Sequence, residues 1–208
     1  MTGRSMLAAA IVVGAAMFTS TSAASAQPPV QVPPVPPGLE VPAGNVAFLR
    51  AFAQGTQNYI CLPVSKKAWR WAFLGPQATL FETDATDGVS ITNQISTHFL
   101  SANPIEAGTP RPTWQDSSDS SRVWGRGRAS STDPNFVEAG AIPWLLVEAT
   151  GAALGPTGGG MLAQTTFIHR LNTSGGAAPA TGCSVVDNVG AVARVPYTTA
   201  YYFYRAAP

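Results

Sequence analysis

The stretch VAFLRAFAQGTQNYIC, from Val46 to Cys61, contains aromatic, aliphatic and β-branched residues in short runs, with Gly55 in its middle. Aromatic and β-branched side chains favour the pleated, half-buried surface of a β-sheet, whereas glycine marks an interruption. We therefore predict two short strands here, at residues 46–53 and 56–61.

The same pattern recurs along the rest of the chain, and no segment shows a long helical period. Further strands are predicted at 68–74, 79–81, 89–95, 122–128, 144–149, 164–170, 191–195 and 200–205. Many short strands with irregular connections predict a single all-β domain, either an antiparallel β-sandwich or a closed β-barrel. Two long loops are expected, at 101–121 and 151–160, and binding residues often lie on such loops.

Residues 1–26 have the pattern of a cleavable secretory signal peptide. Arg4 precedes an apolar run of about 13 residues, and small residues then lead to Ala24-Ser25-Ala26. The run is shorter than the roughly 20 residues of a membrane span, although an uncleaved anchor is the alternative. We therefore expect secretion to the periplasm or the extracellular space, with a proline-rich linker at 27–40 and a secreted β domain at 41–208.

Cys61 and Cys183 are the two cysteines of the chain. An oxidising compartment favours a disulfide between them, and two buried thiols are the alternative. Such a bridge closes a loop of about 120 residues, which contributes roughly 4 to 5 kcal/mol in the chain-entropy model.

Charge and motifs exclude several classes of partner. Without Arg4, eleven basic residues balance eleven acidic ones, so we expect neither nucleic acid nor, after signal cleavage, a membrane as partner. No cofactor is expected, because no Gly-x-Gly-x-x-Gly follows a strand to hold a dinucleotide. No metal site is predicted either, because His98 and His169 lack a second His or Cys at ligand spacing. The oligomeric state is left open.

Tryptophans beside polar side chains are the candidates for ligand binding. In strand register Trp144 and Glu148 share one face, and a carboxylate beside an indole ring is typical of a sugar site. Trp114 and Asp116 lie in the first long loop. The predicted site combines stacking indoles with orienting polar groups. Its members are His98, Trp114, Asp116, Trp144, Glu148 and Arg170.

Several segments together resemble DUF3455, a family of secreted domains of unknown function. They are 53–61, 71–81, 111–114, 123–125, 142–146, 168–176, 179–183 and 195–204, in the family's order. The resemblance implies one exported domain and supports the Cys61 to Cys183 pairing, and it implies no particular activity. In the family a Gly-Pro-Thr-Trp run commonly follows a His within a few residues. The longer separation of His98 and Trp114 here weakens a site built from both.

The sequence thus predicts an exported β domain that binds a small molecule or a cell-wall glycan. Covalent catalysis is not expected, because no Gly-x-Ser-x-Gly nucleophile motif is present. One alternative is a glycan-active hydrolase that uses two of Asp116, Asp119 and Glu148 as acid and base. Another is a structural or host-interaction surface protein, which would expose an apolar patch in place of a pocket.

Overall fold

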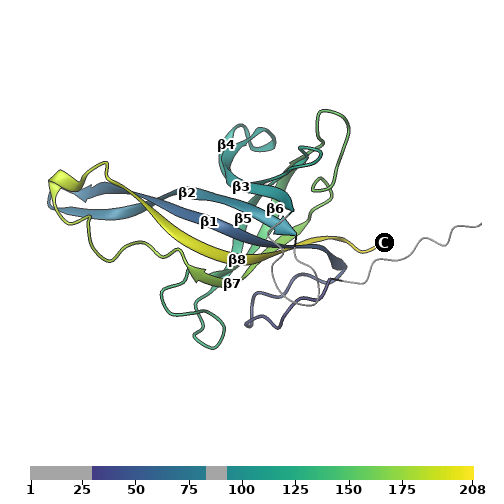
Figure 1. Cartoon of the computed structure of the whole chain (residues 1–208), viewed down its shortest axis with the longest axis horizontal. Helices are drawn as coiled ribbons and strands as arrows, with labels where there is room; N and C mark the ends of the chain where they lie inside the picture. Colours follow the sequence, from purple (N-terminus) through teal and green to yellow (C-terminus); the bar gives the residue numbers. More distant parts are fainter. Residues whose placement is uncertain (1–29, 83–92) are drawn as a thin grey trace, which may run out of the picture.

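A computed structural model describes residues 30–82 and 93–208 of the protein (Figure 1). Eight antiparallel strands form one closed barrel in which each strand pairs with the next and β8 pairs with β1. The strands are β1 (Asn45–Ser65), β2 (Ala68–Glu82), β3 (Gln94–Asn103), β4 (Thr109–Asp116), β5 (Arg122–Ser131), β6 (Trp144–Ala153), β7 (Phe167–Gly175) and β8 (Val192–Ala206). Two short 3₁₀ turns, η1 (Pro104–Glu106) and η2 (Val186–Asn188), complete the secondary structure of this part of the chain.

Of the two predicted architectures, the structure is the closed barrel and not the sandwich. Closure gives every strand a hydrogen-bonded neighbour on each side over part of its length, so no strand is an edge strand throughout. The described residues contain no helix with the length and apolar character needed to cross a membrane. The predicted signal peptide and the start of the predicted strand 89–95 lie outside the described residues.

The long loop predicted at 101–121 is wrong for most of its length, because this segment contains the end of β3, η1 and the whole of β4. Pro110 and Pro112 suggest a break, since proline has no N–H to give to a neighbouring strand. However, β5 pairs with β4 only at residues 113–115. The two prolines therefore lie where β4 has β3 as its only partner, and a missing N–H is tolerated there.

Strand β1 joins the two predicted strands 46–53 and 56–61 through Gly55. A Cβ atom at Gly55 would overlap the carbonyl oxygen of Gln77 and the Cα atom of Ala78 on β2. The glycine therefore marks a close crossing of two strands, and the backbone continues through it as a strand.

The barrel extends on one side into a three-stranded arm, formed by the second half of β1 and the first halves of β2 and β8 (Figure 1). At Ile60 the central strand β1 still pairs with both neighbours, Ala72 of β2 and Val192 of β8. The loop between β7 and β8, which includes η2, runs along this arm and reaches its end.

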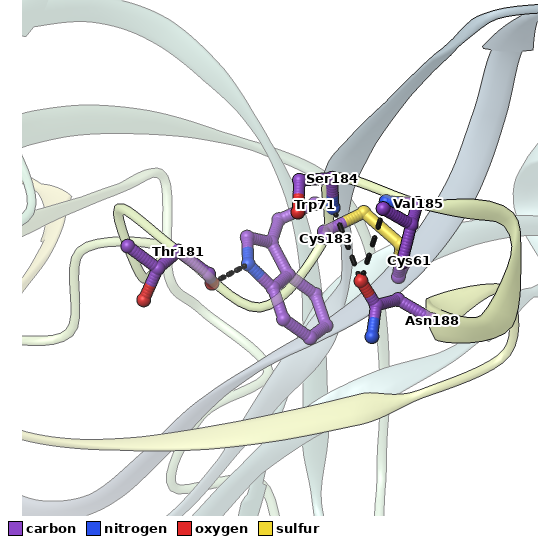
Figure 2. Close-up of a disulfide and its surroundings, with 7 residues drawn as sticks. All are labelled: Cys61, Trp71, Thr181, Cys183, Ser184, Val185 and Asn188. Atoms are coloured by element: carbon purple, nitrogen blue, oxygen red, sulfur yellow. Dashed lines mark hydrogen bonds between the residues drawn. A yellow bond between two sulfur atoms is a disulfide. The ribbon is translucent and has the colours of Figure 1, made fainter.

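The predicted disulfide is confirmed, and it fixes this loop to the arm (Figure 2). Cys61 of β1 and Cys183 of the loop are bonded with their Cα atoms 5.5 Å apart. Close to the bridge, the indole N–H of Trp71 donates to the carbonyl oxygen of Thr181 at 2.9 Å. The side-chain oxygen of Asn188 accepts hydrogen bonds from two backbone N–H groups beside Cys183.

Two hydrophobic clusters lie on opposite faces of the barrel wall. The inner cluster fills part of the barrel and includes Trp114, Tyr201 and Phe203. The outer cluster includes Tyr202 and Tyr204 of β8, the neighbouring side chains of β6 and β7, and the segment from residue 30 to residue 41.

The proline-rich segment that the sequence predicts as a linker lies against the barrel from Val30 onward. Leu39 is buried, and its carbonyl oxygen accepts a hydrogen bond from Nε2 of His169 at 2.6 Å. Nδ1 of the same ring lies 2.9 Å from the Tyr204 hydroxyl, which donates to it when Nε2 carries the proton. Valines between the prolines pack on the outer face because an extended segment leaves its side chains free for such contacts.

Replacing both cysteines, Cys61→Ser with Cys183→Ser, tests the contribution of the bridge. The bridged residues are 122 positions apart, so the chain-entropy model gives a free energy of unfolding lower by roughly 4 to 5 kcal/mol in the variant. Guanidinium unfolding of the oxidised protein and of the variant measures this difference. The reduced wild type serves as control and should match the variant, and a difference below about 1 kcal/mol would contradict the prediction.

Candidate functional site

A cavity of about 110 Å³ lies inside the barrel, and all eight strands contribute to its wall. Register explains why these side chains meet: His98 lies opposite Trp114, and Arg170 lies between Leu145 and Tyr201, so each set points to one side of the sheet. The lining residues are Gln57, Phe73, Pro76, His98, Pro112, Trp114, Gly127, Leu145, Val147, Arg170 and Tyr201. Phe73 and Gly127 are its solvent-exposed members and therefore mark its mouth.

Three aromatic rings in mutual contact form the buried end of the cavity. The rings of His98 and Trp114 are parallel to within 12°, with their centroids 4.2 Å apart. Tyr201 meets both rings edge-on at 5.4 and 5.5 Å. Gly125, which lies next to the indole, makes room for Val147, since a Cβ atom there would overlap the Val147 side chain.

The expectation that a longer separation keeps His98 and Trp114 apart is wrong. The residues between them form a hairpin of β3 and β4, whose register places the two residues directly opposite each other. Extra residues in a hairpin extend it at its turn end and leave the pairing below unchanged. The sequence distance therefore has no effect on the distance between the rings.

His98 is a neutral, buried ring. Its Nδ1 lies 2.9 Å from the carbonyl oxygen of Thr113, which can only accept, so Nδ1 carries the proton and Nε2 is an acceptor. Burial lowers the pKa of His98 to about 3, helped by the Arg170 charge and opposed by the hydrogen bond to Thr113. The ring therefore adds no charge to the cavity at neutral pH.

Among the described residues, Arg170 is the only charged one in the cavity wall. One of its terminal nitrogens donates to the carbonyl oxygen of Pro143 at 2.8 Å, and its Nε is buried. The guanidinium is close to the aromatic end: burial raises the pKa of Tyr201, and the Arg170 charge acts in the opposite direction. The cavity wall contains no carboxylate that could balance this charge.

Four buried polar atoms in the cavity wall lack a well-aligned hydrogen bond among the described residues, although the side chain of Tyr201 interacts with Arg170 and that of Gln57 with Tyr197. They are Nε2 of Gln57, Nε1 of Trp114, Nε of Arg170 and the hydroxyl of Tyr201. Each such atom costs about 1 to 3 kcal/mol when it stays unpaired, and most buried polar groups in proteins are paired. Their concentration in one apolar cavity makes this cavity the candidate functional site.

The structure brings three of the six predicted site residues together, and these are His98, Trp114 and Arg170. Asp116 also points inward, but it borders a separate groove with Phe48 and Arg205. Its Oδ1 accepts hydrogen bonds from Ser118 and from the backbone of Asp119, so the carboxylate stabilises the turn after β4.

Trp144 and Glu148 do share one face of β6, as predicted, but it is the outer face of the barrel. Trp144 packs edge-on against Phe136, with ring centroids 5.5 Å apart. Glu148 forms ion pairs with Arg126 at 3.0 Å and with Arg128 at 3.5 Å. Neither residue reaches the cavity.

The carboxylates proposed for a hydrolase do not flank one cleft. Asp119 accepts hydrogen bonds from the backbone of Ser121 at 2.7 Å and of Met161 at 2.9 Å, which ties two loops together. Asp116 is on the inside of the barrel wall and Glu148 on the outside. Within residues 30–82 and 93–208, no three His, Cys, Asp or Glu side chains lie close enough to hold a metal ion.

Sequence reasoning missed several members of the cavity wall. Leu145 and Val147 alternate along β6 with the predicted Trp144 and Glu148, and this alternation can be seen in the sequence. The sequence does not show which of the two faces points into the barrel. Gln57 is a polar residue in an otherwise apolar inner row, which is the signal that could have identified it.

The fold and the cavity define the class of this protein: a small, closed antiparallel β-barrel whose interior leaves room for one small molecule. Within this class, the chain belongs to the family described as protein of unknown function (DUF3455), whose model matches residues 42–205. This match confirms the resemblance seen in the sequence. Searches of curated proteins and of solved structures found no match.

The depressed pKa of His98 predicts a loss of stability in mild acid. In the unfolded chain His98 takes up a proton near pH 6.5, whereas in the folded protein it does so only near pH 3. The contribution of neutral His98 to the free energy of unfolding is therefore complete above pH 6.5 and is lost as the pH falls. Between pH 7 and pH 5 the stability advantage of the wild type over His98→Gln should shrink by about 2 kcal/mol. Urea unfolding at several pH values measures this change, with Thr97→Ala on the same strand as control. If the free energies of unfolding of the wild type and of His98→Gln changed in parallel with pH, this prediction would be contradicted.

Proposed function

We propose that the protein binds a small molecule in the barrel cavity and does so without covalent catalysis. The observation that carries this proposal is the set of four unpartnered polar atoms in one apolar cavity. A ligand that supplies hydrogen bonds to these atoms removes their desolvation cost, which is free energy available for binding.

The size of the cavity favours a small molecule over a cell-wall glycan. Its volume is about 110 Å³, and an engineered cavity of about 150 Å³ is known to hold benzene. One ring or one short branched chain therefore matches the enclosed space. The exposed ring of Phe73 at the mouth offers an apolar surface for any part of the ligand that projects outward.

The chemistry of the wall supports binding in preference to catalysis. The lining residues include no serine, cysteine or carboxylate. His98 has its Nδ1 bonded to a backbone carbonyl and its ring stacked on Trp114, which suits a fixed wall element. Without a nucleophile or a paired acid and base, the site lacks the groups that acyl or glycosyl transfer requires.

We also propose that the protein acts outside the cytoplasm. The signal-like N-terminus motivates this proposal, and the disulfide between Cys61 and Cys183 supports it, since such bonds persist in oxidising compartments.

The arm favours a second candidate function, contact with another macromolecule. Its end exposes a group of apolar side chains that a barrel alone does not need. These are Leu62, Val64, Val185, Val186, Val189 and Val192. This surface and the cavity lie in different parts of the molecule, so the two functions are compatible.

Narrowing the mouth of the cavity tests small-molecule binding. Gly127 is exposed at the mouth, and a Cβ atom there meets only Leu145 at 3.4 Å, so Gly127→Leu is compatible with the backbone. Ser130→Leu places the same side chain at an exposed position of β5 that does not line the cavity, and it serves as the control. The probes are phenol, benzamide and benzoate, each at about 10 mM, a concentration chosen for affinities near 1 mM.

We expect at least one probe to raise the melting temperature of the wild type and of Ser130→Leu, because a ligand that binds only the native state stabilises it. A Kd of about 1 mM corresponds to about 1.4 kcal/mol at 10 mM ligand. Binding to Gly127→Leu should be at least tenfold weaker. The absence of a shift with all three probes in the wild type would overturn the proposal.

A further inference from the structure

We propose that the ligand of the barrel cavity is a small monocarboxylate whose anionic group is bound by Arg170. This inference rests on the proposed function and specifies the chemical class of the ligand. It follows from the direction of the free hydrogen bonds, from the charge of the wall and from the apolar remainder of the cavity.

The unpartnered atoms require a ligand that accepts hydrogen bonds. Nε2 of Gln57, Nε1 of Trp114 and Nε of Arg170 carry hydrogens and can only donate, and the Tyr201 hydroxyl can also donate. A ligand alcohol accepts at most two hydrogen bonds and an amine at most one, and both bring donors of their own, so neither can satisfy all four atoms. The two oxygens of a carboxylate offer about four acceptor positions, which matches this set.

The charge of the wall favours an anion. An arginine stays protonated in proteins, and an uncompensated charge next to an apolar cavity is costly. The ion pairs among the described residues join Arg111 to Glu106 and join Arg126 and Arg128 to Glu148, so Arg170 takes part in none of them. A carboxylate beside the guanidinium would form charge-assisted hydrogen bonds, which are about twice as strong as neutral ones.

The charge of the ligand is limited to one. Arg170 is the single cation in the wall, and His98 stays neutral because it is buried. A dianion would therefore leave one negative charge without a partner in the cavity. The wall thus matches a monoanion.

The rest of the wall determines the body of the ligand. Phe73, Pro76, Leu145 and Val147 present carbon surfaces, and they line the same cavity as Gln57 and Arg170. Such a wall accepts one aromatic ring or a short branched chain. The hydrogen bond from Arg170 to Pro143 uses one N–H of the guanidinium and leaves the buried Nε for the ligand.

Matched pairs of acid and amide test the inference. Benzoate and benzamide have the same shape and differ in charge, and isovalerate and isovaleramide form a second pair with a branched chain. Dissociation constants are measured by titration for the wild type, Arg170→Gln and Arg50→Gln. Arg50 is the matched control because its Nε is also buried and unpartnered, but its guanidinium lies over Tyr202 of the outer cluster, 5.9 Å from the ring centre.

We expect the wild type and Arg50→Gln to bind one acid at least tenfold more tightly than its amide, and Arg170→Gln to lose this preference. If Arg170→Gln does not fold, Arg170→Lys, which keeps the charge and loses the Nε donor, should show a reduced preference.

The outcomes separate this inference from the proposed function. Equal binding of acid and amide would overturn the monocarboxylate and leave small-molecule binding in place. A preference for the acid that survives in Arg170→Gln would overturn the role of Arg170. Binding of none of the four compounds to the wild type, with no shift in melting temperature, would overturn both proposals.

Discussion

Closure of the sheet is the constraint on which the rest of the structure depends. An eight-stranded barrel has an interior just wide enough to be filled by side chains, so large inward residues must face small ones. Tyr201 lies opposite Ala51 in the adjacent strand, and Gly125 leaves space for the Val147 side chain. The aromatic rings occupy one part of the interior, and the cavity lies where the wall instead contributes Pro76 and Gly127.

Closure also explains why the outer face needs a cover. The strands β6, β7 and β8 carry apolar side chains on both faces, so filling the barrel buries only half of them. The segment from residue 30 to residue 41 covers the outer half, and His169 connects this segment to β8 through its two ring nitrogens. Burial lowers the pKa of His169, which keeps the ring neutral and suited to this bridge between Leu39 and Tyr204.

The sequence allowed the strand content, the disulfide and the family to be predicted, because these depend on local composition and on the type of compartment. It could not distinguish the inner from the outer face of a strand. Alternation placed Trp144 with Glu148 correctly, but the side that faces the barrel is decided by packing with β5 and β7. Strand β4 was missed because its prolines are acceptable only where one neighbour is absent, which is a property of the whole sheet. The stacking of His98 on Trp114 depends on hairpin register, which distance along the chain does not reveal.

The cavity wall is unfavourable for folding in the absence of a ligand. A leucine or methionine at position 170 would fill space and carry no charge, and replacing unpaired buried polar groups by apolar ones is often neutral or stabilising. The chain instead places an arginine, a glutamine and an indole N–H around one small space, and no carboxylate among the described residues lines it. Glu106 and Glu148 form ion pairs with three other arginines outside the cavity. These features of the wall are the physical basis of the proposed ligand, in which an anionic group attached to a small apolar body supplies the partner that the described residues around the cavity do not.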